Sequence, residues 1–156
     1  MGGRYYEDFT IGEEIHSPAK TFSEAEMIDF AFHYDPQPIH IDARAGEASQ
    51  YGGLIASGWQ IIATAFRLFT MTGALGPASE GSPGVDELRW LLPVRPGDTI
   101  HTIVTVEAMR VSRSKPHIGH VTLGYRVVNQ AGETVATMRA VQFMRRREGE
   151  VESRHA

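Results

Sequence analysis

An acid and an imidazole stand close together in a proline-rich segment, and both could take part in proton transfer. The segment reads YDPQPIHID over residues 34–42 and carries Asp35 and His40. Pro36 and Pro38 exclude a regular helix and favour extended backbone at the residues before them, so we expect a rigid loop. An imidazole has an unperturbed pKa of about 6.5 and exchanges protons near neutrality. The pair could therefore hold a water molecule for general acid–base chemistry.

Simpler interpretations of the same residues stay open on spacing alone. An Asp before a proline often starts a turn, and a single His in a loop is often structural or solvated. Asp42 ends the segment where a second short helix, running to about Ser49, is predicted to begin. We therefore interpret Asp42 as a helix N-cap and not as a catalyst.

The composition disfavours several other chemistries. The chain has no cysteine, which excludes disulfides, thiolate metal sites and a cysteine nucleophile. Its seven histidines show no pair at metal-ligand spacing with a matching carboxylate, so no metal site is predicted. There is no Gly-X-Ser-X-Gly motif, which disfavours a serine hydrolase.

The first half of the chain is predicted to be mainly helical. Residues 14–21 form a short strand that Pro18 interrupts, which indicates a sheet edge. Ser23 and Glu26 have capping-box spacing, and apolar residues then follow at helical spacing, so a helix is predicted near residues 24–33. Residues 57–73 contain no proline and are apolar almost all round, which predicts a long buried helix.

The second half is predicted to be a sheet. Strands are expected over residues 84–94, 99–112, 121–128 and 134–146, with a turn at 95–98 and a hairpin turn at 129–133. Helices followed by hairpin-joined strands indicate an α+β fold in which an antiparallel sheet wraps around the long central helix. We expect one domain over residues 1–146 and a frayed polar tail over 147–156.

Charge and hydropathy limit the partners and the compartment. The formal net charge is −4, so no basic field points to nucleic acid. No apolar stretch approaches the roughly 18–20 residues of a membrane span, and the N-terminal residues do not resemble a signal peptide. We therefore expect a cytoplasmic protein without nucleic-acid or membrane partners.

Motifs along the chain resemble those of a known family. DPQPIHID (35–42), GGLIASG (52–58) and GVDELRWLLPVRPGDTI (84–100) together resemble the MaoC-like dehydratases, which include the (R)-specific enoyl-CoA hydratases and have the hot-dog fold. The resemblance runs from about residue 5 to residue 145. Two positions depart from it, because Gln37 stands where the family usually has Asn and Ser57 where it often has His.

This resemblance implies an acyl-thioester hydratase or dehydratase that adds water to a 2-enoyl-CoA or removes it from a 3-hydroxyacyl-CoA. Asp35 and His40 match the catalytic pair. The helix that begins at Gly58 offers backbone N–H groups to a developing enolate, so we expect the Gly58 N–H to be the oxyanion donor. Ser57 and Gly53 are expected beside the substrate, with Ser57 capping the helix. Coenzyme A is part of the substrate, and no separate cofactor is expected.

The resemblance further implies a homodimer or a dimer of dimers. The basic segment 110–117 contains Arg113 and Lys115. It is either a solvated hairpin turn or a contact for the phosphates of coenzyme A. An acyl-CoA thioesterase and a non-catalytic acyl-thioester-binding subunit stay open as alternative functions. The preferred acyl group depends on the directions of residues such as Trp59, Phe66 and Trp90.

Overall fold

A computed structural model of the protein describes residues 3–149. The chain forms short helices, one longer helix and five strands, in the order η1 (Tyr6–Asp8), β1 (Glu14–Thr21), α1 (Glu24–Tyr34), α2 (Pro38–Ile41), α3 (Ala43–Ala48), α4 (Gly58–Thr70), β2 (Val85–Trp90), β3 (Thr99–Val111), β4 (Ile118–Val128) and β5 (Thr134–Arg145).

The five strands form one antiparallel sheet in the order β1-β3-β4-β5-β2. β1 is an edge strand whose register shifts between His16 and Ala19, around Pro18, as the sequence predicts. The expected strand 84–94 is shorter than predicted and does not pair with β3. It forms β2 at the opposite edge, beside β5, so it is not part of the predicted run of hairpins. β4 also starts earlier than expected, at Ile118.

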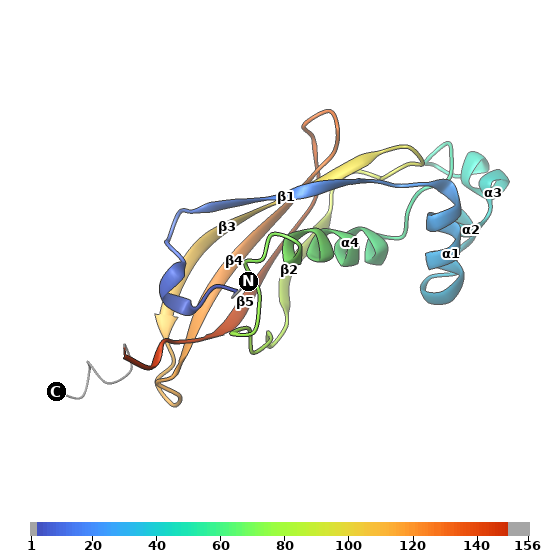
Figure 1. Ribbon diagram of the computed structural model, residues 1–156. Helices are drawn as coiled ribbons and strands as arrows, with labels where there is room; N and C mark the ends of the chain where they lie inside the picture. The colour runs from blue at the N-terminus through green and yellow to red at the C-terminus, as the bar shows by residue number, and fades with distance from the viewer. Residues whose placement is uncertain (1–2, 150–156) are drawn as a thin grey trace.

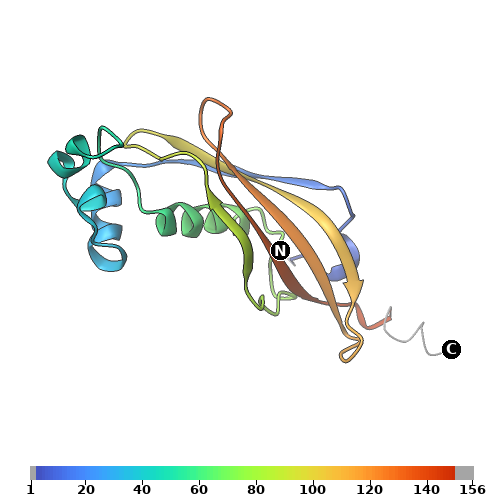
Figure 2. The same ribbon diagram turned by 180° about the vertical axis from the view of Figure 1, so that it is seen from behind.

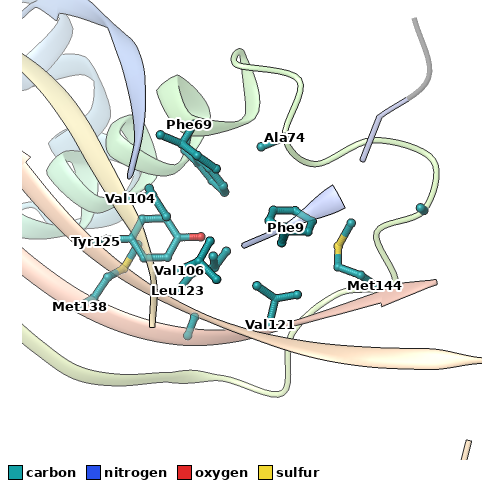
Figure 3. Packing of buried hydrophobic residues seen from close by; sticks show 13 residues of the cluster. Phe9, Phe69, Ala74, Val104, Val106, Val121, Leu123, Tyr125, Met138 and Met144 are labelled. Carbon is teal, nitrogen blue, oxygen red and sulfur yellow. The ribbon is translucent and has the colours of Figure 1, made fainter. Parts of the chain in front are cut away.

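The sheet curves around α4 (Figures 1 and 2), which confirms the predicted hot-dog arrangement. One core cluster lies between α4 and the sheet, where Phe69, Tyr125 and Phe9 point toward one another (Figure 3). The ring of Phe69 meets that of Tyr125 edge-on at 5.4 Å between centroids. A second cluster joins α1 to α4 through Met27 and Ile61. Burial of these apolar side chains fixes α4 against the sheet.

α4 differs from its prediction in length and in burial. It ends at Thr70 and is followed by a turn, in which Gly73 has a φ of 77°. The predicted helix extended to residue 73 because a turn of this kind keeps the same apolar pattern. Trp59 and Phe66 are exposed, so the helix is not buried on every face. The sheet of one chain covers only one side of it.

The helices α1, α2 and α3 gather beyond one end of the sheet (Figures 1 and 2). α1 begins with the predicted capping box of Ser23 and Glu26. Asp42 caps α3, where its carboxylate accepts from the N–H groups of Arg44 and Ala45, and this confirms its interpretation as an N-cap. The prediction of a loop between α1 and α3 is wrong in part. Pro38 starts the one-turn helix α2, because the first helical position needs no N–H donor.

Residues near the C-terminus contact the N-terminal segment. Arg147 donates hydrogen bonds to Asp8, and its backbone N–H donates to Glu7. Arg147 is the first residue of the tail that the sequence predicts to fray. Residues 150–156 of that tail lie outside the described residues.

The core on α4 gives a stability prediction. Phe69 is 0% exposed and Phe32 is 67% exposed. Phe69→Ala should lower the free energy of unfolding by about 3–5 kcal/mol, because it leaves a cavity between α4 and the sheet. Phe32→Ala, the matched control on α1, should change it by less than about 0.5 kcal/mol. Urea unfolding at one protein concentration measures both. Equal losses of unfolding free energy in the two variants would show that the Phe69 contact does not hold α4.

Candidate active site

Asp35 and His40 face each other at the ends of two adjoining helices. Asp35 is the C-cap of α1, and His40 lies on α2. His40 Nε2 lies 3.3 Å from Asp35 Oδ2, and the two side chains are only 7% and 14% exposed. Pro36 and Pro38 force the chain to leave α1 and re-enter a helical turn within a few residues. The structure therefore brings these two predicted residues into direct contact, and their catalytic role stays a prediction.

The second nitrogen of His40 fixes the orientation of the ring. Nδ1 lies 2.8 Å from the carbonyl oxygen of Ile55. A carbonyl oxygen can only accept a hydrogen bond, so Nδ1 carries a proton and donates it. Nε2 then faces the Asp35 carboxylate. This contact is a hydrogen bond when Nε2 also carries a proton, because the carboxylate can only accept.

The carboxylate of Asp35 accepts from several neighbours. Gln37 Nε2 donates to Oδ1 at 2.7 Å, and Ser57 Oγ donates to Oδ2 at 2.7 Å. Burial by itself raises the pKa of Asp35, but the hydrogen bonds from Gln37 and Ser57 and the charge of His40 together lower it below its ordinary value. Asp35 is therefore ionised and accepts these hydrogen bonds.

Ser57 has a different role from the one predicted. It occupies the N-cap position of α4, but its side chain makes no capping hydrogen bond. Its hydroxyl instead donates a hydrogen bond to the Asp35 carboxylate, a charged acceptor that forms a strong bond. Ser57 is fully buried. It therefore ties the start of α4 to the acid.

The start of α4 closes one side of a cavity of about 460 Å³. Asp35, His40 and Gly58 line this cavity together. The first N–H groups of a helix have no partner within the helix, and Ser57 leaves them uncapped. The positive end of the helix dipole thus lies beside a carboxylate–imidazole pair. This combination can transfer protons and can also bind a developing negative charge.

Three predicted substrate-binding residues lie elsewhere. Gly53 does not line the cavity, and its N–H donates to the carbonyl of Gly46. Arg113 and Lys115 lie in the turn after β3, at the end of the sheet opposite to α1, α2 and α3 (Figures 1 and 2). A single chain therefore does not bring them to the Asp35–His40 pair, and their contact with coenzyme A stays a prediction.

Several residues of the site have no signal in the sequence. The carbonyl of Ile55 orients His40, but any residue has a carbonyl, so no side-chain pattern could reveal it. Tyr51, Leu91 and Leu92 also line the cavity. The last two follow β2, and only its position at the sheet edge brings them there. Among residues 3–149 no group of three or more His, Cys, Asp or Glu side chains could hold a metal ion.

Comparison with known proteins agrees with this architecture. Residues 8–131, most of the chain, match the family of MaoC-like domains. The chain belongs to that family. The MaoC-like dehydratase of Rhodospirillum rubrum is 36% identical, with a TM-score of 0.87 over 93% of this chain and 99% of that one.

Two relatives of this MaoC-like domain are named as hydratases. The R-hydratase PhaJ1 of Pseudomonas aeruginosa has a TM-score of 0.69 and 26% identity, over 92% of this chain and 86% of that one. The mesaconyl-CoA hydratase of Cereibacter sphaeroides is 29% identical over 148 residues, which are 94% of this chain and 42% of that protein. None of the helices described over residues 3–149 is long and apolar enough to cross a membrane.

The Ser57–Asp35 hydrogen bond gives a prediction about pH. Ser57→Ala removes a donor that stabilises the ionised carboxylate, so the pKa of Asp35 should rise relative to the unchanged protein. NMR titration of the Asp35 carboxyl carbon measures this pKa. Ser82→Ala removes a hydroxyl from an exposed loop and should leave the titration unchanged. An unaltered or lower pKa in Ser57→Ala would contradict the assigned hydrogen bond.

Proposed function

We propose that this protein hydrates a 2-enoyl-CoA thioester, or dehydrates the corresponding 3-hydroxyacyl-CoA, in the cavity beside α4. The observation that carries the proposal is the Asp35–His40 contact of 3.3 Å within a cavity that the uncapped start of α4 also lines. Addition of water to an enoyl thioester needs a base, an acid and a stabiliser of the enolate oxygen. This one site offers all of these.

In the proposed mechanism His40 starts with a proton on Nε2 and Asp35 starts as a carboxylate. Asp35, which is ionised, takes a proton from a water molecule as the hydroxide adds to the β-carbon of the substrate. His40 gives its Nε2 proton to the α-carbon. The proton now on Asp35 then passes to His40 Nε2 across their contact, and the pair returns to its starting state. Each water molecule supplies one hydroxyl group and one proton to the product, so the balance closes.

The enolate oxygen is the third requirement. The thioester carbonyl gains negative charge while the hydroxide adds, and an N–H donor lowers the energy of that state. The Gly58 N–H at the start of α4 is our candidate donor, because Gly58 lines the same cavity as Asp35 and His40. The dipole of α4 adds to this effect. In this mechanism side chains and backbone supply every group, and no cofactor other than the coenzyme A of the substrate takes part.

The family supports the general chemistry of hydration, since both an R-hydratase and a mesaconyl-CoA hydratase are similar to this chain. The (R) configuration of the 3-hydroxyacyl group is our proposal.

Substitution of the pair tests the reaction. Asp35→Asn and His40→Gln should each lower the rate of crotonyl-CoA hydration by about 10²–10⁴-fold, because a positioned acid or base contributes about this much. Loss of the absorbance of the conjugated thioester measures the rate. Asp42→Asn is the matched control, because Asp42 caps α3 and Asn is an equally good N-cap. Its rate should stay within about twofold of the unchanged protein.

The same assay separates the alternatives. Release of free thiol would indicate a thioesterase, and tight binding of acyl-CoA without turnover would indicate a non-catalytic binding subunit. Either result, or full activity of Asp35→Asn, would contradict the proposed hydration.

We further propose that two copies associate through the β2 edge. Val85 on β2 and Leu91 and Leu92 just after it are exposed. Together with Phe66 of α4, Val85 lines an apolar cavity of about 420 Å³ that opens at the surface. An unpaired edge strand pairs readily with another strand, and a two-fold axis lets the same surface serve both copies.

This association predicts the mass in solution. Light scattering after size exclusion should give twice the 17.2 kDa mass of the chain. Val85→Glu should shift the protein toward the monomer, because it buries a charge in the interface. Ile11→Glu changes another exposed apolar residue, outside the sheet, and should leave the dimer intact. A monomer in the unchanged protein would contradict the interface.

A further inference from the structure

Trp90 connects the edge strand to the start of α4. It is the last residue of β2, and its indole Nε1 donates a hydrogen bond of 2.9 Å to the carbonyl oxygen of Gly58. That carbonyl belongs to the first residue of α4. A carbonyl oxygen has two lone pairs, so it accepts the indole N–H in addition to the helical N–H one turn later.

The ring of Trp90 also lies directly on the Gly58 backbone. A Cβ atom on Gly58 would come within 2.4 Å of Trp90 Cε2 and 2.5 Å of its Nε1, which no side chain can accommodate without movement of the indole. In the structure, the side facing the absent Cβ is occupied by Trp90.

Ser57 also holds this first turn, through Asp35. The Ser57 side chain is committed to Asp35 and does not cap α4. The indole itself has a firm base, because Trp90 pairs with Ala136 of β5 and the N–H groups of Leu91 and Leu92 both donate to the carbonyl of Val135. The neighbouring ring of Trp59 meets Trp90 edge-on at 5.3 Å between centroids. Trp90 therefore connects β5 to the start of α4.

We propose that Trp90 is a positioning residue for the reaction. Its indole N–H bonds the carbonyl of the Gly58–Trp59 peptide, and its ring lies on the Gly58 backbone. Together these contacts hold the backbone of Gly58, and so position the N–H of the preceding peptide toward the place where the enolate oxygen forms. This inference rests on the hydration proposed above. It assigns Trp90, a residue of β2, to the same site. A donor that must meet charge only in the transition state loses its effect when it is tilted away.

Replacement of the indole by a ring without an N–H tests the role. Trp90→Phe should lower kcat for crotonyl-CoA hydration by about tenfold, less than the roughly 10²–10³-fold cost of deleting an oxyanion donor outright. KM should change less than kcat, because the lost interaction acts mainly on the transition state. Trp59→Phe makes the same change in the same cavity, at an indole that makes no hydrogen bond to the described residues. Its effect is expected mainly in KM.

Hydrogen exchange gives a readout that does not depend on activity. The N–H of Ile61 donates to Ser57 in the first turn of α4. In Trp90→Phe the amides of Ile61 and Ile62 should exchange faster, while those of β3 and β4 keep their protection. Size exclusion checks that the variant retains the assembly state of the unchanged protein.

The outcomes are distinct. A tenfold fall in kcat together with faster exchange at Ile61 and Ile62 supports the inference. Unchanged exchange, or faster exchange with kcat within about twofold of the unchanged protein, overturns it. If the unchanged protein hydrates no enoyl-CoA, the proposed function fails and the catalytic role of Trp90 fails with it, whereas the exchange data still decide whether the indole holds the helix.

Discussion

The carboxylate of Asp35 is the acceptor on which the arrangement of the site depends. It lies at the end of α1 and receives donors from the segment that follows and from the start of α4. A charged group that is largely withdrawn from water must have its hydrogen bonds supplied by the protein. Gln37, Ser57 and His40 supply them, and in doing so they bring two separate backbone segments to one point. Satisfying one charge therefore also assembles the reacting groups.

α4 serves two purposes in this structure. Its buried residues, such as Phe69, hold the curved sheet on one side. Its first residue, Gly58, lines the cavity on another. Packing in the core therefore holds the body of α4 rigidly, while Trp90 contacts its first residue. The hot-dog fold suits this chemistry because it places the end of a buried helix, and not the middle, at a cavity.

Much of this arrangement follows from the sequence. The parts that do not follow from it have one physical reason in common. Local signals were sufficient for the capping box at Ser23, the N-cap Asp42 and the strands of the second half, since each depends on neighbours in the chain. Asp35 and His40 stand only five residues apart in one motif, so their proximity could also be predicted. The place of β2 beside β5, the second role of Ser57 and the Trp90–Gly58 contact depend on long-range pairing. Periodicity carries no information about which strands become neighbours.

The position of β2 in the sheet bears on how the protein matures. β2 pairs with β5, the last strand of the described chain, and reaches no other strand. A growing polypeptide thus contains Asp35, His40 and Gly58 long before residues 134–145 exist to seat the indole that lies on Gly58. Contacts that join distant segments form late, because the intervening loop must first be closed. The chemistry of this protein is therefore tied to completion of its fold: a partly synthesised chain holds the reacting groups without the strand that aligns them.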